Sequence, residues 1–75
     1  MIPMENKYKL GDRVKFNKLG DVVEIGEVVS ARIIIPFFVV MYRIIYSSYE
    51  KREEVKWIKE IDILYKVDEN GKKKG

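Results

Sequence analysis

The clearest strand pattern in the chain is Val39-Val40-Met41-Tyr42-Arg43-Ile44-Ile45-Tyr46, where only Arg43 is charged. β-Branched and aromatic residues at this density are typical of a strand. Alternation sends every second side chain to the same face of a strand. One face carries Val40, Tyr42, Ile44 and Tyr46, and the other carries Val39, Met41, Arg43 and Ile45. Both faces are mainly apolar, which predicts a strand with more burial than a one-sided sheet requires.

The residues before this stretch predict further strands and turns. Residues 27–35 are rich in β-branched side chains, and Pro36 must close that strand or lie at a sheet edge because it has no N–H for a ladder. Phe37 and Phe38 then fall at a turn. Nearer the N-terminus, residues 10–12 predict a turn, residues 13–16 a strand with one buried face, and residues 17–20 a second turn. Residues 22–25 form either a short strand or a loop rim that ends at Gly26.

The segment 47–67 allows two interpretations. As strands, residues 55–57 form one segment, the chain bends at residues 59–60, and Ile61, Ile63, Tyr65 and Val67 alternate in the next. As an amphipathic helix, its apolar face would contain Trp57, Ile58, Ile61, Leu64 and Tyr65. Ser47 with Glu50 would then form a capping box, and Gly71 would end the helix. We favour strands because of the strict period of two and the β-branched content.

The spacing of these segments resembles that of a known family. The motifs are Leu10-Gly11-Asp12-Arg13-Val14, Gly26-Glu27-Val28-Val29, Tyr42-Arg43-Ile44-Ile45-Tyr46 and Trp57-Ile58-Lys59-Glu60-Ile61-Asp62-Ile63-Leu64. Together they resemble SH3-like small barrels, a group that includes Tudor domains, KOW domains and the photosystem I accessory subunit of this type. The resemblance implies an all-β fold, a single five-stranded SH3-like barrel with a short 3₁₀ turn before the last strand. It transfers no ligand, because neither the KOW glycine run nor a methyl-lysine cage nor a PxxP-binding surface can be assigned here.

Length and charge set the domain organisation. A chain of 75 residues permits one domain. We expect a barrel over residues 8–67, a flexible lead over residues 1–7 and a basic tail over residues 68–75. The formal net charge is +3, but Lys72, Lys73 and Lys74 supply all of it, since the remaining chain has twelve residues of each sign. The basic character therefore belongs to the tail.

The residue types argue against catalysis. The sequence has no His and no Cys, which excludes disulfides, zinc sites of the usual ligand types and catalytic dyads built on these residues. Ser47, Ser48 and Lys51 lie in a charged loop without an apolar pocket that would shift a lysine pKa. We expect no enzyme activity, metal, cofactor or small-molecule substrate.

The longest apolar run, residues 33–42, is interrupted by Pro36 and is shorter than the roughly 20 residues of a membrane span. No secretion signal is recognisable, so we expect a cytoplasmic protein without membrane contact.

The apolar stretch 33–41 is more than one small barrel can hide. Large exposed apolar patches usually mark interfaces, so one hypothesis is a binding module for a protein partner or a homodimer. The other hypothesis is a long hairpin that folds over its own barrel. For protein binding we expect contacts from Pro36, Phe37, Phe38, Arg43, Tyr49 and Trp57.

Nucleic acid is the alternative partner. Small barrels bind single strands by combining aromatic platforms with basic side chains. The candidate basic residues are Arg13, Lys15, Arg43, Lys56, Lys72, Lys73 and Lys74. Because the chain without its tail is neutral, counterion release would be small, and we expect binding that is weak and depends mainly on the tail.

Overall fold

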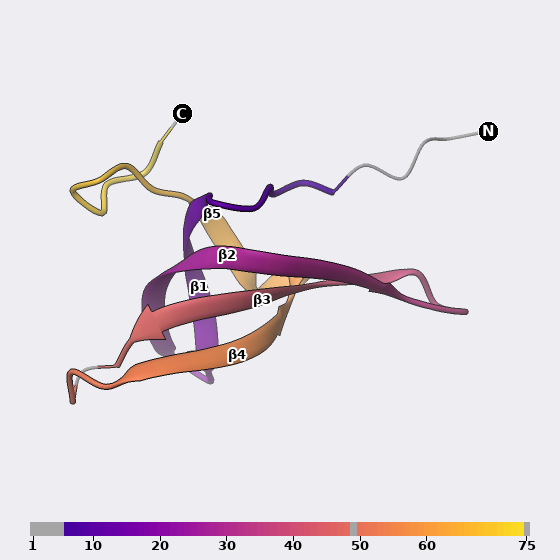
Figure 1. Ribbon diagram of the computed structural model, residues 1–75, viewed down its shortest axis with the longest axis horizontal. Coiled ribbons are helices and arrows are strands. Elements are labelled where there is room, and N and C mark those ends of the chain that lie inside the picture. Colours follow the sequence, from indigo (N-terminus) through magenta and orange to yellow (C-terminus); the bar gives the residue numbers. More distant parts are fainter. Residues whose placement is uncertain (1–5, 49, 75) are drawn as a thin grey trace.

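The computed structural model describes residues 6–48 and 50–74. It contains five strands and one 3₁₀ turn, which are β1 (Arg13–Leu19), β2 (Val22–Ile34), β3 (Val39–Ser47), β4 (Glu53–Lys59), η1 (Glu60–Asp62) and β5 (Ile63–Lys66). All pairings are antiparallel, and the strand order is β4-β3-β2-β1-β5 (Figure 1). The predicted all-β class and the 3₁₀ turn before the last strand are confirmed. The helical interpretation of residues 47–67 is wrong, since strands occupy most of this segment.

The sheet is bent but not closed. Strand β1 crosses behind β2, β3 and β4, and the short strand β5 lies behind β2 (Figure 1). The two edge strands, β4 and β5, form no ladder with each other in the described part of the chain, so a closed barrel is not formed by backbone pairing. Side chains connect β4 to the end of β1 instead. Lys18 Nζ lies 3.2 Å from Glu54 Oε2, and Lys56 Nζ donates a hydrogen bond to the Lys18 carbonyl at 3.1 Å.

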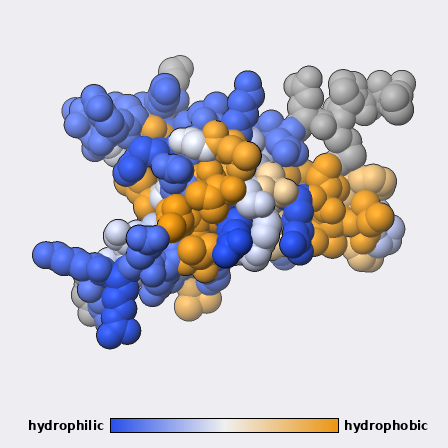
Figure 2. All heavy atoms as spheres, in the orientation of Figure 1, coloured by the Kyte–Doolittle hydropathy of each residue, from blue (hydrophilic) through white to orange (hydrophobic). Residues whose placement is uncertain are grey.

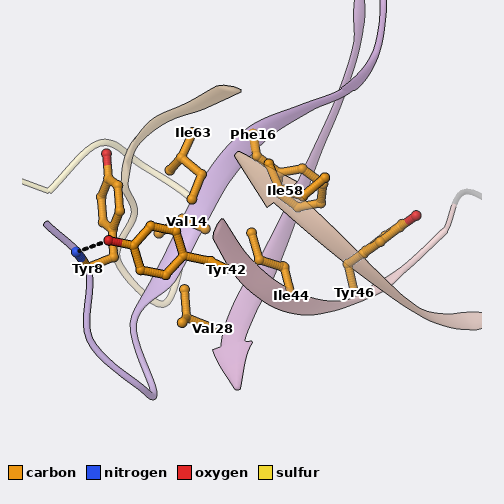
Figure 3. Close-up of a cluster of buried hydrophobic side chains, with 9 residues drawn as sticks. All are labelled: Tyr8, Val14, Phe16, Val28, Tyr42, Ile44, Tyr46, Ile58 and Ile63. Carbon is orange, nitrogen blue, oxygen red and sulfur yellow. Dashed lines mark hydrogen bonds between the residues drawn. The ribbon is translucent and has the colours of Figure 1, made fainter. Parts of the chain in front are cut away.

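One face of the bent sheet holds the core (Figure 3). Phe16 packs edge-to-face on Tyr46, and Tyr8 packs in the same way on Tyr42, with centroid distances of 5.3 and 5.5 Å. The predicted grouping of side chains on one face of β3 is confirmed, and this face points inward: Tyr42, Ile44 and Tyr46 are buried and Val40 packs partly against them. The buried set is Tyr8, Val14, Phe16, Val28, Tyr42, Ile44, Tyr46, Ile58, Ile63 and Val67.

Three local predictions from the sequence differ from the structure. The turn expected over residues 17–20 is narrower, because β1 continues to Leu19. Gly26 does not open a strand but lies inside the continuous strand β2. A Cβ at Gly26 would lie 2.5 Å from the Ile45 carbonyl oxygen, so glycine is required there by the close approach of β3. Ile61 does not alternate with the β5 residues, because η1 breaks the strand period and leaves its side chain 85% exposed.

A buried hydroxyl links three segments of the chain. Tyr42 Oη accepts a hydrogen bond from the Tyr8 N–H at 3.2 Å and donates one to Glu60 Oε2 at 2.5 Å (the former drawn in Figure 3). Burial and the Glu60 carboxylate raise the pKa of Tyr42 to about 12. The hydroxyl thus joins the segment before β1 to β3 and to η1.

The C-terminal segment turns back on itself. Val67 and Lys73 form an isolated antiparallel bridge, and the Lys74 N–H donates to the Lys66 carbonyl at 2.9 Å. Asp68 Oδ1 accepts the N–H groups of Asn70 and Lys72, which shapes the turn between them. The lysines at 72–74 are exposed, as expected for a basic tail, but their backbone is held against the end of β5.

Candidate binding surfaces

The β2–β3 hairpin extends beyond the rest of the sheet. We call residues 33–40 the arm; they comprise the end of β2, the turn of residues 35–38 and the start of β3. The arm forms the right-hand end of the molecule in Figure 1, and apolar side chains gather there in Figure 2. Phe37 is 80% exposed, Ile35 71% and Phe38 59%. The structure therefore does not fold this hairpin over the sheet, which was one of the two hypotheses.

Both edges of the arm lack a neighbouring strand among the described residues. The β1 ladder on β2 ends at Glu27, and the β4 ladder on β3 ends where Lys59 pairs with Met41. A two-stranded ribbon is marginally stable without further packing, and free edges are templates for pairing with another chain. No charged residue protects these edges, because none lies between Arg32 and Arg43.

A basic and aromatic face lies next to the arm. Arg43 of β3 stands opposite Trp57 of β4, and the Arg32 guanidinium of β2 lies 4.5 Å from the centroid of the Trp57 ring. This distance is typical of a cation–π contact. We call Arg32, Arg43 and Trp57 the Arg–Trp face. The predicted residues Arg43 and Trp57 are thus brought together, whereas Tyr49 lies outside the described residues.

Sequence reasoning missed two contributors to this end of the molecule. Arg32 was not among the candidate residues, because its contact with Trp57 depends on the register of two ladders. Ile61 was placed in the alternating strand pattern of residues 61–67. It instead lines a groove of about 370 Å³ under the arm, together with Phe38, Val39, Val40, Lys59 and Glu60. In the sequence, only its position next to the predicted bend at residues 59–60 indicated that Ile61 could leave the strand pattern.

The seven candidate nucleic-acid-binding residues are spread over β1, β3, β4 and the C-terminal turn. Lys15 of β1 and Lys73 of the C-terminal turn place their ammonium groups 5.9 and 5.4 Å from the centroid of the Tyr65 ring. Lys56 instead reaches the carbonyl of Lys18. Arg43 belongs to the Arg–Trp face. The remaining three, Arg13, Lys72 and Lys74, are exposed on β1 and on the C-terminal turn.

Ion pairs shift the pKa values of several surface groups. The Tyr46 hydroxyl and the Lys18 ammonium lower the pKa of Glu54, and the Glu54 carboxylate raises that of Lys18. Burial opposes ionisation of Asp12, but the Lys9 N–H and Lys66 overcome it and lower its pKa. The Lys66 and Asp12 charged groups lie 3.3 Å apart. These pairs lie in the sheet and at its N-terminal turn, and the arm contains no titratable group.

Two general observations complete the description of these surfaces. In residues 6–48 and 50–74, no helix has the length and apolar character needed to cross a membrane. Comparisons of the chain with protein-family models, curated proteins and solved structures found no match.

Proposed function

We propose that this chain is a non-catalytic, SH3-like binding module that holds another protein molecule on its arm. The exposed apolar arm carries this proposal. Strand alternation leaves apolar side chains on both of its faces, and the three most exposed ones at its tip are Ile35, Phe37 and Phe38. Contiguous apolar surface of this kind marks interaction sites on folded proteins.

The SH3-like part of the proposal rests on the arrangement of the strands. Five antiparallel strands with a 3₁₀ turn between β4 and β5 support this part of the proposal, since the resemblance implies the same number of strands and the same turn. Contacts of Lys18 with Glu54 and Lys56 span the side where a backbone ladder is missing. These contacts favour a small barrel that side chains complete.

The neighbouring Arg–Trp face suits the edge of a protein interface. Tryptophan and arginine are enriched among the residues that dominate binding energy. Trp57 is half-buried and is covered on one side by Arg32, so its position is fixed before a partner binds. Fixed anchors lose little conformational entropy on association.

Photo-crosslinking tests the proposal. The chain has no Cys, so Ile35→Cys provides a single attachment point for a crosslinker at the tip. We expect saturable adducts, either with the chain itself or with another protein, that disappear in a Phe37→Ser, Phe38→Ser background. A Leu10→Ser, Leu19→Ser background is the matched control, because these leucines are 67% and 74% exposed in other parts of the molecule. Adducts that survive loss of both phenylalanines would overturn an arm-centred function.

A specific observation supports nucleic acid as a second candidate. Lys15, Tyr65 and Lys73 combine an aromatic ring with two ammonium groups, the pairing that single-strand binding requires. Fluorescence anisotropy with a single-stranded oligonucleotide tests this candidate. Lys15→Ala with Lys73→Ala should weaken binding and reduce its salt dependence, while Lys56→Ala, on a different surface, should have a smaller effect. Affinity that responds equally to all three changes would argue against a defined site.

A further inference from the structure

Exposed apolar residues lie at the tip of the arm and next to its base. At the tip, Phe37 is 80% exposed. At the base, Ile61 is 85% exposed beside the groove of about 370 Å³. Phe38 reaches the groove, but Phe37 does not line it, and both Phe37 and Ile61 stay exposed among the described residues.

The groove exists because β4 stops before β3 does. Lys59, the last residue of β4, pairs with Met41, and η1 then turns the chain away. Val39 and Val40 of β3 continue past this point with β2 on one side and open space on the other. The groove is therefore the space that a longer β4 would fill. Its apolar lining comes from Phe38, Val39, Val40 and Ile61, and Lys59 and Glu60 complete it.

We propose that a second copy of this chain occupies the groove, with the two arms packed antiparallel so that Phe37 of each copy lies beside Ile61 of the other. The proposal rests on the proposed function and names the protein that the arm binds. In a two-fold symmetric pair every contact occurs twice. One docking event would therefore cover both tips and both grooves, which no single chain can do.

The exposed area is sufficient for a weak but specific pair. Phe37 and Phe38 are 80% and 59% exposed, and Ile35 is 71% exposed. With roughly 150–250 Å² for each aromatic side chain, the arm and Ile61 together offer about 500 Å² per copy. A pair would then bury about 1,000 Å², which is near the lower limit for a specific interface. We expect a dissociation constant on the order of micromolar.

Charge favours the antiparallel arrangement over a parallel one. Arg32 and Lys59 flank Met41 in the row next to the arm, and Arg43 lies two rows further along β3. Glu60 is the acidic residue that lines the groove, so three positive charges against one leave the base of the arm positive. Parallel arms would bring the two positive bases together, and juxtaposed like charges disfavour a complex. Antiparallel arms place each base against the uncharged tip of the other copy.

Disulfide trapping tests the geometry, because the native chain has no Cys. Purified Phe37→Cys and Ile61→Cys variants are mixed under mild oxidation. We expect the mixed disulfide between residues 37 and 61 to form faster than either symmetric disulfide. Leu19→Cys, at a site 74% exposed outside the arm, reports random collision and should trap neither variant above background.

Sedimentation of cysteine-free protein gives an independent readout. Wild type should shift from monomer to dimer with rising concentration, and Ile61→Lys should weaken this association at least about tenfold, since each copy loses one buried apolar side chain and gains a charge. Ile61 is exposed, so the monomer fold should tolerate the change.

The outcomes separate this proposal from the proposed function. A dominant symmetric disulfide between two residues 37 would overturn the antiparallel geometry. A monomeric wild type with trapping no better than the Leu19→Cys control would exclude the second copy as partner. In that case, arm-dependent crosslinks to a different protein would support the proposed function. If such crosslinks were absent too, both the proposed function and the self-association would be overturned.

Discussion

The body of the sheet and the arm contain the same kinds of apolar residue, but these residues are buried in the body and exposed in the arm. Phe16 on β1 is completely buried, whereas Phe37 in the arm turn is 80% exposed. In the body, strands on both sides and the bend of the sheet enclose one face, and the other face carries most of the charge. The arm has two strands with no further strand beside either edge among the described residues, and Val40 at its base packs partly against the core. Burial in this chain therefore follows the number of neighbouring strands and not the local density of apolar residues.

The two phenylalanines give the largest expected contrast. Phe16→Ala removes a fully buried ring and its edge-to-face contact with Tyr46, so we expect a loss of about 3–5 kcal/mol in the free energy of unfolding. Phe37→Ala should change the stability of the monomer by less than about 0.5 kcal/mol, because its ring contacts mainly solvent. Urea denaturation at low protein concentration measures both.

This contrast fails if Phe37→Ala lowers the free energy of unfolding of the dilute monomer as much as a core substitution does. The arm would then fold against the body in solution, and its apolar residues would not be available to a partner. A cost for Phe37→Ala that appears only at high protein concentration would instead sharpen the contrast, since association stabilises the folded form by mass action.

Much of the body was predictable from the sequence, because alternation fixes which side chains share a face of one strand. Tyr42, Ile44 and Tyr46 illustrate this point. Alternation does not fix which residues of different strands meet, and for this reason the contact of Arg32 with Trp57 was missed. It also fails where the period changes. Ile61 lies in a 3₁₀ turn and is exposed, although it fits the strand pattern of the residues that follow it.

The arm was predictable only as an excess of apolar residues over what a small barrel can bury. The sequence left open whether this excess folded inward or outward. That outcome depends on where β4 ends relative to β3, a register that no local pattern determines. The same limit applies to closure of the sheet, because side chains from β1 and β4 span a side that has no ladder.

An intermediate effect is expected from Tyr42 at alkaline pH. Its pKa is raised to about 12 in the folded protein, against an ordinary value of 10.0. Between these values the unfolded chain ionises Tyr42 while the folded chain does not. The contribution of Tyr42 to the free energy of unfolding is therefore complete below pH 10 and is lost as the pH rises toward 12. The loss is about 2 kcal/mol at pH 12.

Tyr42→Phe provides the control for this pH dependence. The variant loses two hydrogen bonds at neutral pH, which should cost about 1–3 kcal/mol. Its stability should then fall less steeply than that of wild type between pH 10 and 12, because the two proteins differ only in the Tyr42 hydroxyl. Parallel pH profiles would mean that the Tyr42 hydroxyl is not held by burial and Glu60.

The smallest effect is expected where side chains join β1 to β4. Glu54→Gln removes the ion pair with Lys18, but both side chains are substantially solvated, and such pairs contribute little to stability. Lys56 still donates to the Lys18 carbonyl, and the Lys18 ammonium still lies 5.2 Å from the Tyr46 ring centroid.

The pKa of Glu54 is lowered in the folded protein. Its contribution to the free energy of unfolding is therefore present above its ordinary pKa and is lost as the pH falls through the folded value. Thermal denaturation of wild type and variant should therefore differ little near neutral pH, with the difference shrinking further at high salt. A loss comparable to that of Phe16→Ala would show that this junction holds the bent sheet together, and the body would then depend on side-chain closure as strongly as on its core.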